Sequence, residues 1–245
     1  MSGRQGPGER VTLPDEAALA AESSRRLAAA LRESLGARGA ATLAVSGGTT
    51  PLETYRRLAR ETGIDWGRVD VVWIDERAVP PTHDRSNYRW AKETLLDGAA
   101  VPPARVHRMH AERPDADAAA REYERTLIEV TRTKAGAVPV IDVAVLGIGD
   151  DAHVASLFPG EATNDIRDRF VIAVPPGEGH EARMTVTAPV LEAAAHSFVL
   201  VAGASKRPAL QRVFQAEGDR RATPGRVFRD CRGPVVWLLD ASAGE

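Results

Sequence analysis

Two kinds of apolar pattern alternate along the chain. Short continuous apolar runs are typical of strands that are covered on both faces, and apolar residues three or four positions apart are typical of helices that bury one side. We predict strands at residues 41–47, 69–75, 140–147, 169–174, 197–203 and 233–240. Helices are predicted at residues 15–36, 50–63, 115–133, 189–195 and 205–215.

Two of these helices carry recognisable end signals. The helix at 15–36 is expected to close at Gly36, because glycine is the commonest residue just beyond a helix. The helix at 50–63 is expected to begin with a capping box, in which Thr50 caps the first turn and Glu53 completes the motif.

Strands that alternate with helices require crossover connections. The fold class that follows is α/β, with a mostly parallel sheet covered by helices on both faces. No linker, repeat or low-complexity stretch divides the chain, so we predict a single domain over residues 10–245 and a flexible N-terminus over residues 1–9. Ligands of such sheets bind beyond the carboxyl ends of the strands, so the loops that follow strands are the candidate sites.

Composition narrows the class of partner. The 245 residues include 32 basic and 34 acidic ones, a net charge of −2, so we expect neither nucleic acid nor a membrane as a partner. Cys231 is the single cysteine, which excludes an intramolecular disulfide and fits a reducing compartment. The N-terminal stretch lacks the apolar segment of a secretory signal. We therefore expect a cytoplasmic protein.

The first candidate loop is VSGGTTP, residues 45–51. A strand ends there, two glycines turn the chain and a helix begins, so backbone N–H groups at the helix start can form an anion cradle. The candidate ligands of the anion are Ser46, Gly47, Gly48 and Thr49. The alternative is an ordinary glycine turn before a helix.

The second candidate is the triplet Asp75, Glu76 and Arg77, at the end of a predicted strand. Aspartate and glutamate have poor β-propensity, so their presence there calls for a reason. Two carboxylates beside an arginine can hold sugar hydroxyls or orient a base. They can equally form a structural ion pair that fixes the loop. The SNY sequence at 86–88 is expected to cap a further helix.

The third candidate is the pair Asp151 and His153, which follows the strand at 140–147. A histidine can act as a general base near neutral pH, and a neighbouring carboxylate can orient its ring. The alternative is a plain polar turn. A metal site needs more ligands at short spacing, and none are present in the sequence around this pair, so we predict no metal.

The fourth candidate combines Arg183 and Lys206. Lys206 stands at the start of a predicted helix, where a cation opposes the helix dipole, and this placement is favourable if an anion binds there. The alternative is a lysine that points into solvent. Together with the loop at 45–51, the two cations fit a phosphomonoester.

Taken in order, these segments resemble the 6-phosphogluconolactonases. The matching blocks are SGGTTPLETY, WIDERAVPPTHDRSNY, LGIGDDAHVASLFPG, RMTVTAPVL and LVAGASKRPALQ, with VVWLLD near the end. The resemblance implies a sugar-phosphate isomerase-like fold. It also implies hydrolysis of the phosphosugar lactone 6-phospho-D-glucono-1,5-lactone, with no organic cofactor and no required metal.

The resemblance assigns the candidate residues to two groups. His153 is the expected general base, and the residues expected to support it or the reacting centre are Asp151, Arg77, Asp75 and Glu76. The expected phosphate ligands are Ser46, Gly47, Gly48, Thr49, Arg183 and Lys206. The sequence yields no prediction of the oligomeric state.

Two alternatives stay open. Glucosamine-6-phosphate deaminases share the fold and a similar turn, but they usually continue from the histidine into Asn-Glu-Pro, whereas this chain continues into VASLFPG. The other alternative is a sugar-phosphate-binding paralogue without catalysis. Regulators of that kind normally carry a DNA-binding helix-turn-helix, for which this chain has no spare length.

The turn around His153 departs from the family pattern Asp-Gly-His-Thr, because Ala152 and Val154 replace the glycine and the threonine. If the glycine is required for a positive φ, alanine costs about 1 kcal/mol or more. If it is required for close approach of the ligand, the added methyl group crowds the lactone. Valine keeps the shape of threonine but loses its hydroxyl group.

Overall fold

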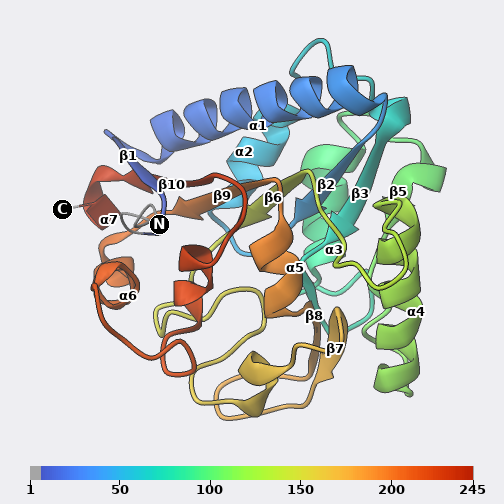
Figure 1. Cartoon of the computed structure of the whole chain (residues 1–245). Helices are drawn as coiled ribbons and strands as arrows, with labels where there is room; N and C mark the ends of the chain where they lie inside the picture. The colour runs from blue at the N-terminus through green and yellow to red at the C-terminus, as the bar shows by residue number, and fades with distance from the viewer. Residues whose placement is uncertain (1–6, 245) are drawn as a thin grey trace.

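The computed structural model describes residues 7–244, and its main feature is a seven-stranded sheet (Figure 1). From one edge to the other, the strands are β1 (Glu9–Leu13), β10 (Val235–Asp240), β9 (His196–Val201), β6 (Val143–Leu146), β2 (Ala41–Val45), β3 (Val69–Trp73) and β5 (Val106–His107). All of their pairings are parallel. Every residue of β2, β3 and β6 is buried, which accounts for their continuous apolar runs.

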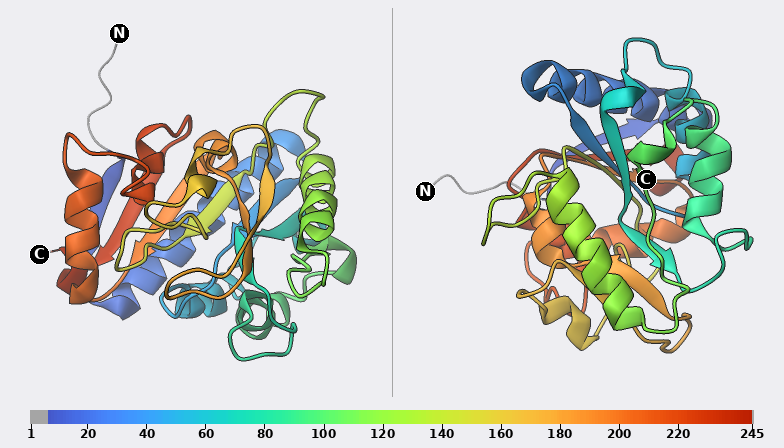
Figure 2. Two further views of the ribbon diagram at one scale, coloured as in Figure 1. Left: turned by 90° about the horizontal axis from the view of Figure 1, so that it is seen from below. Right: turned by 90° about the vertical axis from the view of Figure 1, so that its right-hand side faces the viewer.

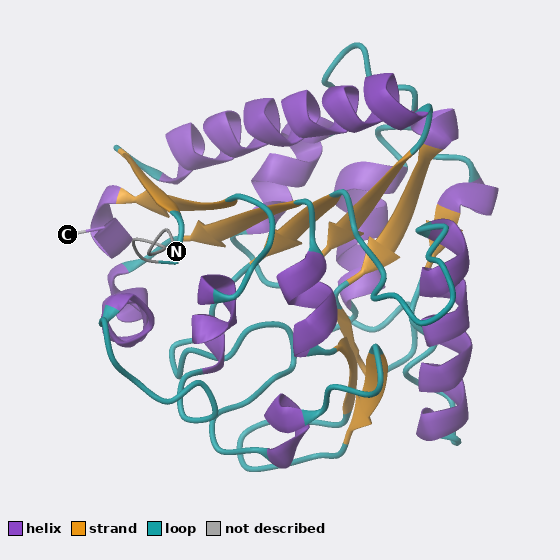
Figure 3. Cartoon of the chain, viewed as in Figure 1, coloured by secondary structure: helices purple, strands orange, loops and turns teal. Residues whose placement is uncertain are grey.

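Helices lie on both faces of this sheet (Figures 1 and 3). On one face lie α1 (Glu16–Arg38) and α2 (Pro51–Leu58), and on the other lie α5 (Ala188–Ala193) and α6 (Arg207–Phe214). The remaining helices are α3 (Asn87–Ala91), which a π-helical turn (Lys92–Leu96) continues, α4 (Ala116–Val130) and α7 (Ala241–Gly244). The predicted fold class is confirmed. Within residues 7–244, no helix combines the length and the apolarity that crossing a membrane requires.

A second, antiparallel sheet lies beside the large one, and the sequence patterns did not predict it. It joins β4 (Asp75–Arg77), β8 (Arg183–Val186) and β7 (Val171–Val174), in that order. We expected the apolar run at 169–174 to join the parallel sheet, and this expectation is wrong, because β7 pairs antiparallel with β8. An apolar run indicates that a strand is buried, but it does not specify the partner strand.

Two predicted helix ends are also wrong. Helix α1 passes through Gly36 and stops at Gly39, whose φ is 72° and whose N–H donates to the Leu35 carbonyl. A glycine inside a helix costs only about 1 kcal/mol, so it does not have to end the helix. Thr50 already has helical φ and ψ, and its side chain makes no capping hydrogen bond, so the predicted capping box with Glu53 does not form.

Strand β1 was not predicted either. It lies at the edge of the sheet, and no position in it is fully buried, so it lacks the apolar run that marked the other strands. It begins at Glu9, which falls within the segment 1–9 that we expected to be flexible. The rest of that expectation concerns residues 1–6, which lie outside the described part of the chain.

The order of the strands reverses next to β2. From β2 the chain continues outward to β3 and β5, whereas β6 pairs with the other side of β2 and leads outward to β9 and β10. Such a switch point leaves a crevice at the carboxyl ends of the two central strands. The loops that follow β2, β6 and β9 therefore meet at one place, and these are three of the loops that the sequence singled out.

Candidate active site

A cavity of about 290 Å³ lies at this switch point, and we call it the switch-point cavity. Nine of the eleven predicted site residues line it: Ser46, Gly47, Gly48, Thr49, Asp75, Arg77, His153, Arg183 and Lys206. The other two, Glu76 and Asp151, do not line it, but they contact residues that do. Within residues 7–244, no group of three or more histidine, cysteine, aspartate or glutamate side chains is arranged to hold a metal ion.

Asp151 fixes the ring of His153. Its Oδ1 lies 2.6 Å from His153 Nδ1 and also accepts a hydrogen bond from the His153 backbone N–H at 3.0 Å. With Nδ1 held by the carboxylate, Nε2 is the ring nitrogen available to a ligand in the cavity. Gly149 makes this turn possible, because a Cβ on it would lie 2.1 Å from His153 Nδ1.

Lowering the pH should weaken the fold through Asp151. Burial alone raises the pKa of this carboxyl group, but the hydrogen bonds from His153 outweigh burial and lower it to about 2 from the ordinary 3.8. A depressed pKa adds stability above the pKa of the unfolded state, and this stability is lost as the pH falls from about 4 towards 2. The side chain is 49% exposed, so solvent screening limits the contribution to about 1 kcal/mol.

Urea unfolding of the wild type and of Asp151→Asn measures this contribution. At neutral pH the wild type should be the more stable protein, and the difference in unfolding free energy should shrink near pH 3, below the ordinary carboxyl pKa of about 4. A difference that stays constant between the two pH values would contradict the prediction.

Glu76 supports the loop rather than the cavity. Its carboxylate accepts hydrogen bonds from the backbone N–H groups of Arg77, Asn87 and Tyr88, each at 2.8 Å, and from the Ser86 hydroxyl at 3.1 Å. Burial raises its pKa, although the backbone hydrogen bonds oppose this. Of the two expected roles, hydroxyl acceptor or support, the contacts favour support.

Asp75 joins three parts of the site. Its carboxylate accepts a hydrogen bond of 2.6 Å from the Ser156 hydroxyl and one of 3.2 Å from the Asn87 amide, and it lies 3.6 Å from the Arg183 guanidinium. Asp75 is only 5% exposed. Because both carboxylate oxygens have protein partners, Asp75 is placed to hold the turn after β6, helix α3 and strand β8 together.

Two of these partners were missed by the sequence analysis. Asn87 lines the switch-point cavity, and its amide oxygen accepts a hydrogen bond from Arg77. Its position explains Gly47, because a Cβ there would lie 1.7 Å from the Asn87 oxygen. The sequence predicts a helix cap at SNY, which Ser86 does supply, and it assigns no contact in the cavity to Asn87. Ser156 carries no sequence signal of its own, since its partner Asp75 is distant in the chain.

The loop after β2 is held from below by Tyr55. The Tyr55 hydroxyl accepts a hydrogen bond from the Ser46 N–H at 3.0 Å and donates one to the Ser46 carbonyl at 3.1 Å. Burial raises the pKa of Tyr55, so the hydroxyl keeps its proton. The loop next to Ser46 leads directly into α2, whose first turn lines the cavity without a side-chain cap. This arrangement suits an anion.

The two expected cations come to the cavity from different elements, Arg183 from strand β8 and Lys206 from the 3-10 turn after β9. Arg183 is 13% exposed at its side chain, and Lys206 is 24% exposed and lies 2.9 Å from Asp150. The Ser46 hydroxyl and the Nε atoms of Arg77 and Arg183 are buried and have no hydrogen-bond partner within residues 7–244. Three buried polar groups around one cavity are the kind of groups that a polar ligand satisfies.

An aromatic stack lies behind His153. The Phe158 ring packs against His153 with 4.8 Å between centroids, and the Arg183 guanidinium lies 5.3 Å from the Phe158 centroid. On Phe158 stacks His180, at 3.9 Å and nearly parallel, and its Nε2 lies 2.9 Å from Glu161. Phe158 therefore supports both a candidate base and a candidate anion ligand.

Comparisons with known proteins identify the family of this chain. Residues 14–237 match the family described as glucosamine-6-phosphate isomerases/6-phosphogluconolactonase. A 6-phosphogluconolactonase of Nostoc sp. is 39% identical over 232 residues, which is 95% of each chain. One of Rhizobium meliloti is 40% identical over 229 residues, covering 90% of this chain and 92% of the relative. The chain belongs to this family.

Solved structures of the family have the same fold. The 6-phosphogluconolactonase of Leishmania guyanensis matches with a TM-score of 0.84 and 27% identity, over 97% of this chain and 98% of that one. The enzyme of Shewanella baltica matches with a TM-score of 0.85 and 27% identity, over 96% and 98%. A monomeric glucosamine-6-phosphate deaminase reaches a TM-score of 0.80 at 19% identity over 96% and 98%, and this likeness concerns the fold alone.

The departure from the family pattern at Ala152 has a conformational consequence. Ala152 has a φ of 72°, so alanine stands here in the left-handed region that favours glycine. The residue is fully buried and does not line the switch-point cavity, so its methyl group does not crowd a ligand there. Val154 is also fully buried, within the hydrophobic core, where its apolar side chain needs no hydrogen-bond partner.

Glycine substitutions should separate backbone strain from burial in this turn. Ala155 is also left-handed, with a φ of 53°, but it is only partly buried. Ala155→Gly should raise the unfolding free energy by about 1 kcal/mol, since it relieves the strain. Ala152→Gly should raise the unfolding free energy by less than half as much, because this variant also loses a buried methyl group that contributes about 0.8 kcal/mol. Urea unfolding measures both, and a larger gain for Ala152→Gly would contradict the prediction.

Proposed function

We propose that this chain hydrolyses 6-phospho-D-glucono-1,5-lactone to 6-phospho-D-gluconate, the second step of the oxidative pentose phosphate pathway. The observation that carries the proposal is the His153–Asp151 pair, whose histidine lines the same cavity as the candidate anion-binding loop and two cations. The relatives named 6-phosphogluconolactonase, which match over nearly the whole chain, support the same conclusion. We also propose that it acts in the cytoplasm, as its composition led us to expect.

His153 is the general base of the proposed reaction. A δ-lactone is an activated ester, so a positioned water molecule is a sufficient nucleophile. Nε2 of His153 takes a proton from this water as its oxygen attacks C1 of the lactone. When the tetrahedral intermediate collapses, the bond between C1 and the ring oxygen breaks, and His153 returns the proton to that oxygen. Asp151 stabilises the imidazolium that forms in between.

The cations have two roles in the proposed reaction, one at the reacting carbonyl and one at the phosphate. Arg77 is fixed by the Arg85 carbonyl and by Asn87, and it faces the negative oxygen that develops on C1. The phosphate group lies on the loop of residues 46–49 and is bound by Arg183 and Lys206. Binding at this remote group orients the reacting carbonyl, so part of the phosphate-binding energy appears as rate.

An assay on freshly generated 6-phosphogluconolactone tests the proposal. The rate of base uptake at constant pH should exceed the spontaneous rate of hydrolysis, which a sample without protein provides. Glucosamine 6-phosphate, assayed in parallel, should release no ammonia, since VASLFPG follows the histidine instead of Asn-Glu-Pro. Ammonia release would favour a deaminase, and binding of the sugar phosphate without turnover would favour a paralogue that only binds.

A further inference from the structure

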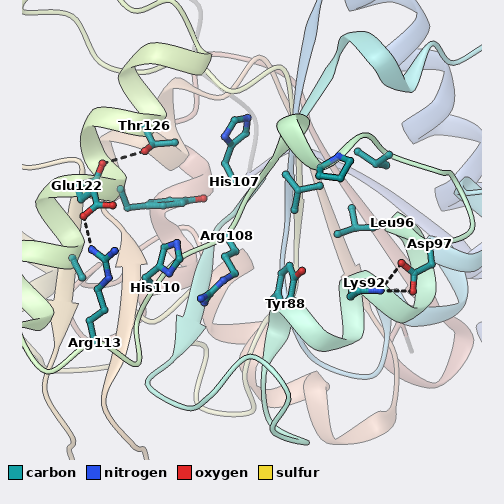
Figure 4. Close-up of a pocket in the computed structure, with 15 residues that line it drawn as sticks. Tyr88, Lys92, Leu96, Asp97, His107, Arg108, His110, Arg113, Glu122 and Thr126 are labelled. Carbon is teal, nitrogen blue, oxygen red and sulfur yellow. Dashed lines mark hydrogen bonds and ion pairs between the residues drawn. The ribbon is translucent and has the colours of Figure 1, made fainter.

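A second cavity, larger than the first, lies at the far edge of the large sheet (Figure 4). Its volume is about 460 Å³, and among the described residues none lines both cavities. We call it the edge cavity. It is bounded by strand β5 with the segment that follows it, by α3 with its π-helical turn, and by α4. Figure 2 (right) looks onto this edge, where α4 stands at the front.

The inner wall of the edge cavity is apolar and aromatic. Leu96, Val101 and Tyr123 are buried residues of its lining, and the partly buried Tyr88 lines it too. The Tyr123 hydroxyl accepts a hydrogen bond of 2.7 Å from the backbone N–H of Trp73. Its polar end is therefore used away from the cavity, so its ring presents an apolar surface. A wall of this kind suits a flat apolar ring.

The rim of the edge cavity is basic. Four basic side chains come from one short segment, His107, Arg108, His110 and Arg113, and Lys92 adds a fifth from the π-helical turn. Arg113, His110, Arg108 and Tyr88 follow one another along one side of Figure 4. The charged lining residues are three cations (Lys92, Arg108 and Arg113) and two carboxylates (Asp97 and Glu122), and the third carboxylate partner, Glu112, does not line the cavity.

An anion can displace the carboxylates that now pair with this rim. Lys92 pairs with Asp97 and Arg113 pairs with Glu122, and all four side chains are 44% exposed or more. Exposed pairs contribute only about 0–1 kcal/mol, so exchanging one for a ligand anion costs little. Arg108 is more buried, at 22% exposed, and is held by Glu112 at 2.8 Å. A guanidinium has five N–H donors, so Arg108 can bind a second anion while it keeps Glu112.

We propose that the edge cavity binds an organic anion that carries a flat aromatic ring, of the size of a nucleoside monophosphate. The ring lies against Tyr88, Tyr123 and Leu96, and the phosphate is bound by Arg108 with Arg113. A phosphosugar has no ring of this kind and leaves the apolar wall without a partner. A purely apolar molecule leaves the basic rim without one.

The position of α3 links the two cavities. Asn87 lines the switch-point cavity, and its neighbour Tyr88 lines the edge cavity. The backbone N–H groups of both residues donate to Glu76. A ligand in the edge cavity therefore contacts the helix that positions Asn87 in the other cavity, while it leaves the other cavity free to bind its own ligand.

Calorimetric titration with adenosine 5′-monophosphate tests the site on the full chain. The nucleotide should bind saturably at one site, whereas adenosine and ribose 5-phosphate, which each lack one half, should bind at least about tenfold more weakly. Arg108→Gln should weaken binding by a similar factor. Thr126→Trp fills the cavity from α4 and should abolish binding. Arg125→Gln, which removes a charge from an exposed position of α4 that lines neither cavity, should change nothing.

Three results would overturn the proposal. They are no saturable binding of the nucleotide, equal binding of ribose 5-phosphate, and binding that survives both Arg108→Gln and Thr126→Trp. Displacement by saturating 6-phosphogluconate would do so too, because it would place the nucleotide in the switch-point cavity. Circular dichroism and melting temperature show whether each variant is folded. Binding is measured without turnover, so a failure of the proposed lactonase activity is a separate result.

Discussion

Replacing His153 with alanine should lower kcat/KM for 6-phosphogluconolactone by about 10²–10⁴, the usual contribution of a general base. Among the described residues that line the switch-point cavity, His153 is the only histidine, and the Asp151 carboxylate lies 2.6 Å from its Nδ1. The loss should appear in kcat, because the role proposed for His153 is to activate the water and not to bind the phosphate. The measurement is the initial rate after subtraction of spontaneous hydrolysis.

His83→Ala is the matched control for this variant. His83 is an exposed histidine that lines neither cavity, so its removal should leave kcat/KM unchanged. The melting temperature of His153→Ala should stay close to that of the wild type if the loss is chemical. An unchanged kcat/KM in His153→Ala would remove His153 from the mechanism.

Arg183→Ala should lower kcat/KM for the phosphorylated lactone by about 10–10², because a hydrogen bond to a charged group contributes about 1.5–3 kcal/mol. The same variant should change the rate on unphosphorylated glucono-1,5-lactone by less than about threefold, since that substrate has no phosphate to lose. Lys206→Ala should follow the same pattern with a smaller effect, because Lys206 is the more exposed cation. The measured quantity is the ratio of kcat/KM for the phosphorylated lactone to kcat/KM for the unphosphorylated one.

Arg85→Ala is the control for the change of charge. Arg85 is 60% exposed, pairs with Glu181 and does not line the switch-point cavity, so its removal should leave the ratio unchanged. If Arg183→Ala lowered the rate on both lactones equally, Arg183 would act on the reacting centre instead. Its contact with Asp75 gives that outcome a physical basis.

The sequence predicted the candidate site better than it predicted the small sheet. Ser46, His153 and Lys206 follow β2, β6 and β9, three strands that are neighbours in the sheet. Once a parallel sheet is inferred, residues at the carboxyl ends of its strands are expected to converge. The local patterns of apolar runs and glycine turns therefore carry enough information to locate them.

What the sequence did not predict depends on contacts between distant segments. Ser156 donates to Asp75, and Asn87 bonds both Asp75 and Arg77, but no local pattern encodes these pairs. The antiparallel pairing of β8 with β4 is non-local in the same way, whereas β7 and β8 are consecutive strands. The β-propensity of a segment indicates that it can form a strand, but tertiary contacts determine which other strand it pairs with.

The two hydrogen bonds between the Tyr55 hydroxyl and the Ser46 backbone have a kinetic consequence. Both the N–H and the carbonyl of Ser46 are bonded to one buried hydroxyl, so neither peptide group can rotate without breaking a buried hydrogen bond. In the proposed reaction, the loop would meet the phosphate already in its binding shape, and little conformational entropy would be lost on association. Association should therefore be a single fast step whose rate falls as ionic strength rises, since charge attraction and not loop rearrangement governs the encounter.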